Sequence, residues 1–187
     1  MASKRDDILD TALTLFSING YHGVGVDRIK EGANVSKMTM YKYFPTKEIL
    51  IENVLLKRDE IFRNGMSDAI KKADSSYNKI KSVFEWHQQW FAREEFYGCM
   101  FIKASEEFPD ETSDIRKIAK EHKLFIKDTL QNILELENIE DADDLSYQLL
   151  ITLEGLIVNA NMFSNYCGVE ISWKFISQLL GLRGIKK

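Results

Sequence analysis

Helix-breaking residues are nearly absent from most of this chain. It contains two prolines, Pro45 and Pro109, and four of its ten glycines fall between residues 20 and 32. Proline removes a backbone donor and glycine costs conformational entropy inside a helix, so long helices can form almost everywhere else. No segment alternates apolar and polar residues over enough positions to predict a strand. The sequence therefore predicts an all-α fold.

Size and composition are those of a globular protein in a reducing compartment. The 187 residues correspond to about one domain, or to one small and one medium domain. Apolar residues make up 44% of the chain and the formal net charge is −4, which excludes a disordered chain. Two cysteines allow at most one disulfide bond, so we expect a cytoplasmic protein. Charged residues at the N-terminus argue against a signal peptide, and polar interruptions of the apolar stretch 145–163 argue against a membrane contact.

Charge is distributed unevenly along the chain. Residues 1–64 hold 10 Lys and Arg against 9 Asp and Glu, whereas the remainder holds 15 against 20. The N-terminal third is therefore the part of the chain that can approach a polyanion without a net electrostatic penalty.

Three helices are expected in this N-terminal third. Apolar residues at helical spacing predict the first helix over residues 4–18. Two short helices follow at about 27–33 and 37–43, separated by Asn34-Val35-Ser36. Asparagine tolerates the left-handed conformation that a sharp turn requires, and serine is a good helix N-cap. We expect Pro45-Thr46 to end the third helix and to cap a fourth.

A short helix, a sharp turn and a second short helix form the outline of a helix-turn-helix, here at about residues 25–44. The second helix of such a motif is narrow enough to enter a major groove. Met40 and Phe44 are expected to point inward, because residues four apart share a helix face. Lysine charges and tyrosine and threonine hydroxyls on the other side suit phosphates and base edges. The candidate DNA-binding residues are Ser36, Lys37, Met38, Thr39, Tyr41, Lys42, Tyr43 and Lys47.

The ordinary alternative for such a helix is a solvated face, since short Lys- and Tyr-rich helices occur in many proteins that do not bind DNA. The order of the residues favours a DNA-binding helix over a solvated face. Gly20-Tyr21, Val26 to Ile29, Gly32 to Phe44 and Thr46-Lys47-Glu48 resemble the DNA-binding signature of the tetracycline-repressor (TetR) family. About ten positions agree in order and spacing, and they cover a quarter of the chain.

The resemblance implies a transcriptional regulator with a three-helix DNA-binding head over residues 1–47 and a larger helical ligand-binding and dimerisation body over residues 48–187. It also implies a homodimer that acts as a repressor, leaves its double-stranded DNA operator when a small molecule binds, and uses the candidate residues above on DNA. Four features depart from the family pattern. Val24-Gly25 replaces the usual hydroxyl residue and Lys30 stands where alanine is usual. Asn34 replaces the turn glycine, and Met38 replaces the glycine of the recognition helix.

Aromatic residues crowd the middle of the chain. Aromatic side chains at helical spacing most often form a core, yet an apolar ligand cavity needs the same walls. The sequence therefore predicts an apolar or aromatic small-molecule ligand of unknown identity. The candidate ligand-binding residues are Phe84, His87, Trp90, Phe91, Tyr97, Phe101, Phe125 and Phe163.

The helix expected at about residues 143–165 is apolar on more than one side, so it needs cover on two sides. Pairing with the last helix, at about residues 170–182, and with a second copy of the chain would form a four-helix interface. The alternative is a central helix inside a monomer. The candidate dimer residues are Leu149, Leu153, Leu156, Phe175 and Leu179.

Two other classes of function receive less support. The three histidines lack metal-ligand companions at a usual spacing, and no glycine-rich phosphate loop follows a strand, so we expect no enzyme, no metal site and no cofactor. A protein-interaction module that uses the helical body alone stays open, as does a DNA-binding regulator without small-molecule control.

Overall fold

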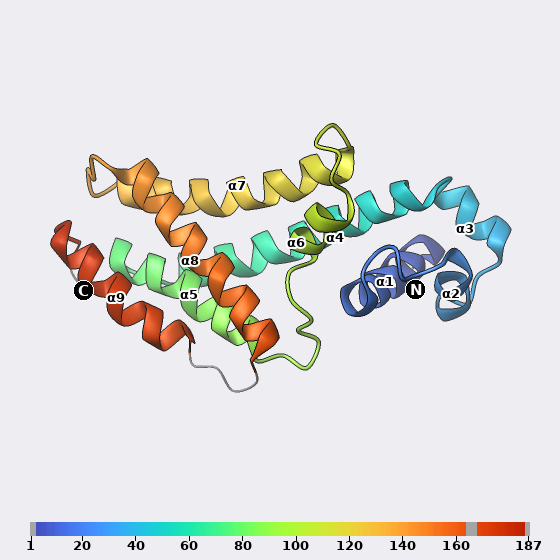
Figure 1. Cartoon of the computed structure of the whole chain (residues 1–187), viewed down its shortest axis with the longest axis horizontal. Coiled ribbons are helices and arrows are strands. Elements are labelled where there is room, and N and C mark those ends of the chain that lie inside the picture. Colours follow the sequence, from blue (N-terminus) through green and yellow to red (C-terminus); the bar gives the residue numbers. More distant parts are fainter. Residues whose placement is uncertain (1–2, 164–167, 186–187) are drawn as a thin grey trace. The chain divides into compact units, whose positions relative to one another are not determined.

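A computed structural model describes residues 3–163 and 168–185 of the chain, and every regular element in those ranges is a helix (Figure 1). This confirms the all-α prediction. The helices are α1 (Lys4–Asn19), α2 (Val26–Gly32), α3 (Lys37–Tyr43), α4 (Lys47–Lys71), α5 (Ser76–Phe91), α6 (Met100–Glu107), α7 (Asp114–Glu135), α8 (Ala142–Met162) and α9 (Gly168–Leu182). The expected end of one helix at Asn165 and the second cysteine, Cys167, lie outside the described residues.

Two compact units divide the chain, and neither is continuous in sequence. The first unit comprises residues 1–61 and 99–122, and the second comprises residues 62–98 and 123–187. Helices α4 and α7 therefore contribute to both units. The head expected over residues 1–47 lies inside the first unit, and α6 lies in the same unit. The assignment of functions to residues 1–47 and 48–187 stays a prediction.

In the first unit, α1, α2 and α3 pack against one another. Their core consists of fully buried apolar side chains: Ile8, Ala12, Phe16, Tyr21, Val24 and Ile29. Helix α1 begins with a capping box, in which Ser3 and Asp6 each accept a hydrogen bond from the other's backbone. It ends at Gly20, whose φ of 73° and ψ of 175° are open mainly to glycine.

Side-chain bridges attach α1 to the first part of α4. Arg5 Nη2 donates to Asn53 Oδ1 at 2.7 Å, and its guanidinium lies over the ring of Phe44. Lys57 Nζ pairs with Asp10 at 2.6 Å. Polar contacts between helices therefore supplement the apolar core of this unit.

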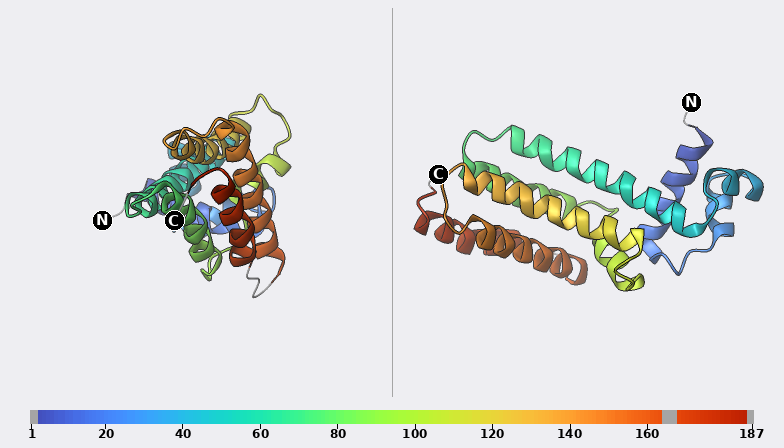
Figure 2. Two further views of the ribbon diagram at one scale, coloured as in Figure 1. Left: turned by 90° about the vertical axis from the view of Figure 1, so that its left-hand side faces the viewer. Right: turned by 90° about the horizontal axis from the view of Figure 1, so that it is seen from above.

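In the second unit, α5, α8 and α9 pack against one another, and Figure 2 shows these helices from two further sides. Trp173 of α9 packs edge-on against Tyr77 and tilted against Phe84, both on α5. A bidentate pair between Arg183 and Asp141 ties the end of α9 to the start of α8. One of the two apolar sides predicted for α8 is covered within the chain, where Leu145, Leu149 and Leu153 are buried.

Candidate nucleic-acid interface

Helix α3 is capped by its own side chains. Ser36 is the N-cap residue, with extended backbone angles, and its Oγ accepts a hydrogen bond from the Thr39 backbone N–H at 3.1 Å. The Ser36 and Thr39 hydroxyls also bond each other at 2.8 Å. The N-cap prediction for Ser36 is therefore confirmed. Both hydroxyls are engaged at the start of α3, so a new partner there would have to share or replace that bond.

The two sides of α3 separate as the sequence predicted. Met40 and Phe44 are each 2% exposed, and both pack into the core of the first unit. Met38 is 82% exposed, whereas Tyr41 and Tyr43 keep about two-fifths of their surface in solvent. Lys37 and Lys42 are exposed on the same short helix. The outer side of α3 thus presents two ammonium groups, two phenols and one thioether.

The turn between α2 and α3 depends on Asn34, which has a φ of +51°. The backbone N–H of Asn34 donates to Glu31 O, and that of Val35 donates to Lys30 O at 3.0 Å. These bonds satisfy the last carbonyls of α2, as a residue in the left-handed conformation after a helix commonly does. Asn34 therefore takes the role that glycine has in the family pattern.

Helix α2 begins without a side-chain cap. Its N-cap residue is Gly25, and an added Cβ at this position would meet nothing within 4 Å. A hydroxyl residue would fit there, but glycine supplies no donor or acceptor group of its own. The departure noted in the sequence therefore leaves the start of α2 without a side-chain contact.

Helix α4 begins at Lys47, which is half-buried. Thr46 caps this helix, because its Oγ1 accepts a hydrogen bond from the Ile49 backbone N–H at 3.2 Å. Lys47 therefore stands in the first turn of a long helix, directly after the short connection from α3. The sequence predicted both the cap and the position of the lysine.

Three of the eight predicted ligand-binding residues, His87, Trp90 and Phe91, pack against one another in the second unit. His87 and Trp90 contact Phe62 and Phe91 through ring edges, with centroids between 5.5 and 6.1 Å apart. His87 Nδ1 lies 2.7 Å from Val83 O, and Phe84, on the same helix, is fully buried. These side chains therefore form much of the core of this unit.

The other predicted ligand-binding residues do not join this group. Phe101 belongs to the first unit, where its ring stacks on His122. Tyr97 is 39% exposed and Phe163 is 52% exposed, while the ring of Phe125 lies under the guanidinium of Arg63 at 4.0 Å. The structure thus does not gather the eight residues around one apolar space.

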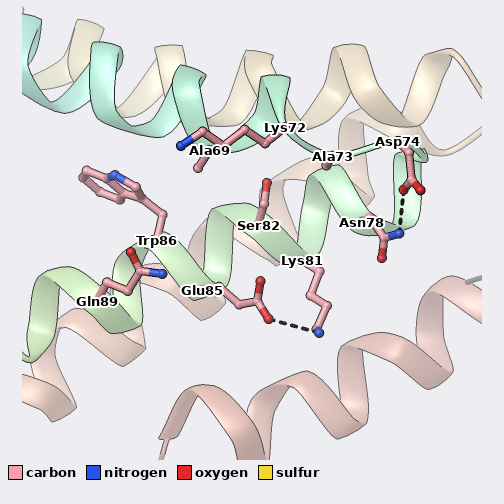
Figure 3. Close-up of a pocket in the computed structure, with 10 residues that line it drawn as sticks. All are labelled: Ala69, Lys72, Ala73, Asp74, Asn78, Lys81, Ser82, Glu85, Trp86 and Gln89. Carbon is pink, nitrogen blue, oxygen red and sulfur yellow. Dashed lines mark hydrogen bonds and ion pairs between the residues drawn. The ribbon is translucent and has the colours of Figure 1, made fainter.

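A pocket of about 460 Å³ opens between the end of α4 and α5 (Figure 3). Trp86 and Gln89 stand at one end of it and Asp74 and Asn78 at the other. Asn78 Nδ2 donates to Asp74, and Lys81 pairs with Glu85 at 3.0 Å. The lining is mainly polar, and it includes none of the aromatic residues predicted to bind a ligand.

The predicted dimer residues divide into two groups. Leu149, Leu153 and Leu156 of α8 are buried within their own chain, whereas Phe175 of α9 is 66% exposed and Leu179 is half-buried. The three leucines of α8 therefore stabilise the single chain and cannot face a second copy in this conformation. The sequence showed that α8 is apolar on two sides, but it did not show which side faces the core.

Two negative findings apply to the described ranges. Within residues 3–163 and 168–185, no helix is both long and apolar enough to cross a membrane. Across the same residues, no three His, Cys, Asp or Glu side chains come together as potential ligands of a metal ion.

Comparisons with known proteins agree with this geometry. Residues 8–54 match the family model described as bacterial regulatory proteins, tetR family. A TetR-family transcriptional regulator from Streptomyces coelicolor has a crystal structure that superposes with a TM-score of 0.86 and 25% identity, covering 98% of this chain and 96% of that one. Residues 8–54 are thus a TetR-type DNA-binding segment, and the chain has the fold of a solved TetR-family regulator.

Two HTH-type transcriptional regulators also match along nearly their whole length. IcaR of Staphylococcus epidermidis, named as the HTH-type negative transcriptional regulator of the biofilm operon icaADBC, is 25% identical over 170 residues, covering 90% of each chain. YjdC of Escherichia coli, an HTH-type transcriptional regulator, is 18% identical over 180 residues, covering 95% of this chain and 93% of YjdC. The family model and these relatives are all named as regulatory proteins and not as enzymes, in agreement with the expectation from the sequence.

Proposed function

We propose that this TetR-family regulator is a repressor that binds double-stranded DNA through α3. The observation that carries the proposal is the outer side of α3, where Lys37, Lys42, Tyr41 and Tyr43 stand around the exposed Met38. Lysines neutralise phosphates as point charges, and tyrosine hydroxyls donate to phosphate oxygens. An exposed thioether has no stabilising partner in water, but it can pack against sugars and thymine methyl groups in a groove.

Lys47 completes the proposed interface, together with Ser36 and Thr39. A lysine in the first turn of a helix is unfavourable, because that end of the helix carries positive partial charge. A phosphate bound there would be attracted by both the lysine and the helix end. The Ser36 and Thr39 hydroxyls keep acceptor capacity beyond their mutual bond, and the Thr39 methyl offers a contact for thymine.

Two relatives support this assignment. The solved structure titled as the TetR-family transcriptional regulator CifR, complexed with 26 bp double-strand operator DNA, superposes with a TM-score of 0.80 at 18% identity, covering 93% of this chain and 96% of that one. IcaR is named as a negative regulator. We extend operator binding and repression to this chain on the combined basis of these names and the composition of α3.

We also propose a homodimer, formed through the outer sides of α8 and α9. Large apolar residues recur there at intervals of four and seven, which places them on one face of each helix. They are Tyr147, Ile151, Val158 and Met162 on α8, and Ile171, Phe175 and Leu182 on α9. A second copy of the same surface would cover them in a two-fold arrangement. Two recognition helices held about 34–36 Å apart would then read a palindromic operator.

A small apolar or aromatic molecule would release the operator by binding the body. The residues proposed for its site include Phe84, His87, Trp90 and Phe91, so the ligand would have to separate rings that contact one another in this structure. This packing favours a second candidate function, a DNA-binding regulator without small-molecule control. Linkage separates the two, because a releasing ligand must bind less tightly when operator DNA is present, by the same factor.

Selection of genomic fragments with the purified protein tests the proposed function. We expect enrichment of a palindromic fragment and a retarded band in dilute buffer that disappears as salt rises. Candidate apolar ligands are then titrated with and without the selected fragment. Failure to retard any duplex in dilute buffer would leave the helical body as a protein-interaction module and overturn the proposal.

A further inference from the structure

Helix α6 contacts the connection between α1 and α2, far away in sequence but in the same compact unit. The carboxylate of Glu107, the last residue of α6, accepts hydrogen bonds from two consecutive backbone N–H groups. Oε1 lies 2.9 Å from Tyr21 N, and Oε2 lies 2.6 Å from His22 N. His22 Nδ1 also lies 2.8 Å from Oε2. One side chain thus binds three groups of the connection.

The connection is shaped to receive this carboxylate. Gly20 precedes the two N–H groups with a φ of +73°, and a Cβ added to it would lie 2.6 Å from Glu107 Oε1. Two consecutive N–H groups that point at one carboxylate form charge-assisted bonds, which are shorter and stronger than neutral ones. A side chain at position 20 would therefore conflict both with the backbone conformation and with the bound carboxylate.

Further contacts of α6 support the same arrangement. Lys103 Nζ donates to Ser17 O in the last turn of α1 at 2.6 Å, and α1 has no basic residue of its own in that turn. A cation at the C-terminal end of a helix is stabilising. Tyr21 Oη donates to Met100 O at 2.8 Å inside the core, and the Phe108 ring stacks on His22.

The charge of Glu107 is maintained by the same contacts. Burial of Glu107 acts to raise its pKa, but the hydrogen bonds from His22 N, Tyr21 N and the His22 imidazole together lower that pKa below its usual range. The other polar and charged groups nearby are Lys103 and Glu106 on α6, Cys99 at its start, and the buried Tyr21 phenol.

We propose that Glu107 is a positioning residue for DNA binding, which acts through Tyr21 and His22 to hold the α1–α2 connection in the orientation that specific DNA requires. The connection leads directly into α2, and α1, α2 and α3 pack against one another, so a displacement of the connection would be transmitted to α3. The inference rests on the proposed DNA binding. It concerns specific recognition most, because base contacts depend on orientation more than phosphate contacts do.

Glu107→Gln tests the proposal, because glutamine keeps the size of the side chain but loses the charge and one of the two acceptor oxygens. The control is Glu106→Gln, which removes the same charge from the neighbouring exposed position. Binding of each full-length protein to the selected genomic fragment and to a shuffled duplex is measured by fluorescence anisotropy at one salt concentration. We expect Glu107→Gln to lose about tenfold or more in affinity for the fragment and less than about threefold for the shuffled duplex.

A variant that keeps the wild-type ratio of the two affinities would overturn the positioning role. Loss of both affinities in equal proportion, with a lowered melting temperature, would also overturn it and leave Glu107 as a stabilising residue only. Wild-type protein that binds neither duplex would instead refute the proposed function itself.

His22→Gln provides a second test should Glu107→Gln fail to fold, because it leaves both backbone bonds to Glu107 in place. The affinities of this variant and of the wild type for the fragment and for the shuffled duplex are compared at one salt concentration. We expect the ratio of fragment affinity to shuffled-duplex affinity to be lower in His22→Gln, because the variant loses the imidazole contact with Glu107. An unchanged ratio would contradict the role of the His22–Glu107 contact.

Discussion

The imidazole of His122 stacks on the ring of Phe101, with centroids 3.6 Å apart and planes inclined by 10°. His122 Nδ1 also lies 2.7 Å from Asp59 Oδ1, and the His122 side chain is 1% exposed. This group joins residues of α4, α6 and α7 within the first unit. The same unit holds α3, so the group stabilises the part of the chain that carries the proposed DNA interface.

Replacing His122 by alanine should therefore destabilise the protein. The change removes the stacked ring and leaves Asp59 without this partner, and we expect the free energy of unfolding to fall by about 2–4 kcal/mol. Urea titration followed by circular dichroism measures the change. Lys120→Ala, at an exposed position of the same helix, is the control and should stay within about 0.5 kcal/mol of the wild type. A His122→Ala midpoint that matches this control would contradict the prediction.

Tyr41→Ala and Lys47→Ala should weaken binding of operator and shuffled duplex alike, because both side chains are assigned to phosphates. For Lys47→Ala the plot of log affinity against log salt should become shallower by about 1, since one fewer counterion is released. Lys71→Ala removes a highly exposed lysine from the far end of α4 and should leave the slope unchanged. Equal slopes for Lys47→Ala and the wild type would remove Lys47 from the interface.

The connection between α1 and α2 begins at Gly20 and ends at Gly25. Replacing each glycine by serine should change the free energy of unfolding in opposite directions. Gly25→Ser supplies a side-chain cap for α2 in open space, and we expect a gain of about 0.3 kcal/mol in the free energy of unfolding. Gly20→Ser forces a Cβ onto Glu107 in a backbone conformation that serine disfavours, and we expect a loss of about 1–3 kcal/mol. Thermal unfolding of both variants measures these changes. Two variants that are both stabilised, or both destabilised, would contradict the roles given to Gly20 and Gly25.

Ile151→Glu should convert the proposed dimer into monomers, because it places a charge in the middle of the exposed face of α8, where Ile151 is 66% exposed. Multi-angle light scattering measures the mass in solution. The control is Leu136→Glu, at an equally exposed leucine just after α7. Leu153→Glu is unsuitable for this purpose, because Leu153 is fully buried and a charge there would unfold the chain. A dimer that survives Ile151→Glu would exclude this face as the interface.

Acidification should destabilise the wild-type protein more than it destabilises the Glu107→Gln variant. The pKa of Glu107 in the folded chain lies below its ordinary value of 4.5, because the hydrogen bonds to Tyr21 and His22 outweigh burial. A carboxyl group with a lowered folded pKa contributes stability above its unfolded pKa and loses that contribution as pH falls through the folded value. Urea midpoints measured at about pH 6 and about pH 3 should therefore differ less in Glu107→Gln than in the wild type. Parallel shifts in the two proteins would show that Glu107 does not contribute.

Local features of the fold could be read from the sequence. The cap at Ser36, the left-handed Asn34 and the inward positions of Met40 and Phe44 each follow from residue type and from spacing within a few residues. The scarcity of proline and glycine likewise predicted the helical class. These features depend on the conformational preferences of the chain itself, which neighbours in sequence largely determine.

Only the tertiary structure decided which apolar surfaces are covered and which distant polar groups meet. Helix α8 is apolar on two sides, and packing against α5 and α9 determines that Leu153 is buried while Ile151 is exposed. Tyr21 and Glu107 are 86 positions apart, and no sequence pattern links a backbone N–H to a remote carboxylate. The sequence thus determined the helices and the composition of α3. The arrangement of the helices determined the aromatic core, the exposed face of α8 and α9, and the contact of α6 with the head, because these depend on which surfaces exclude water together.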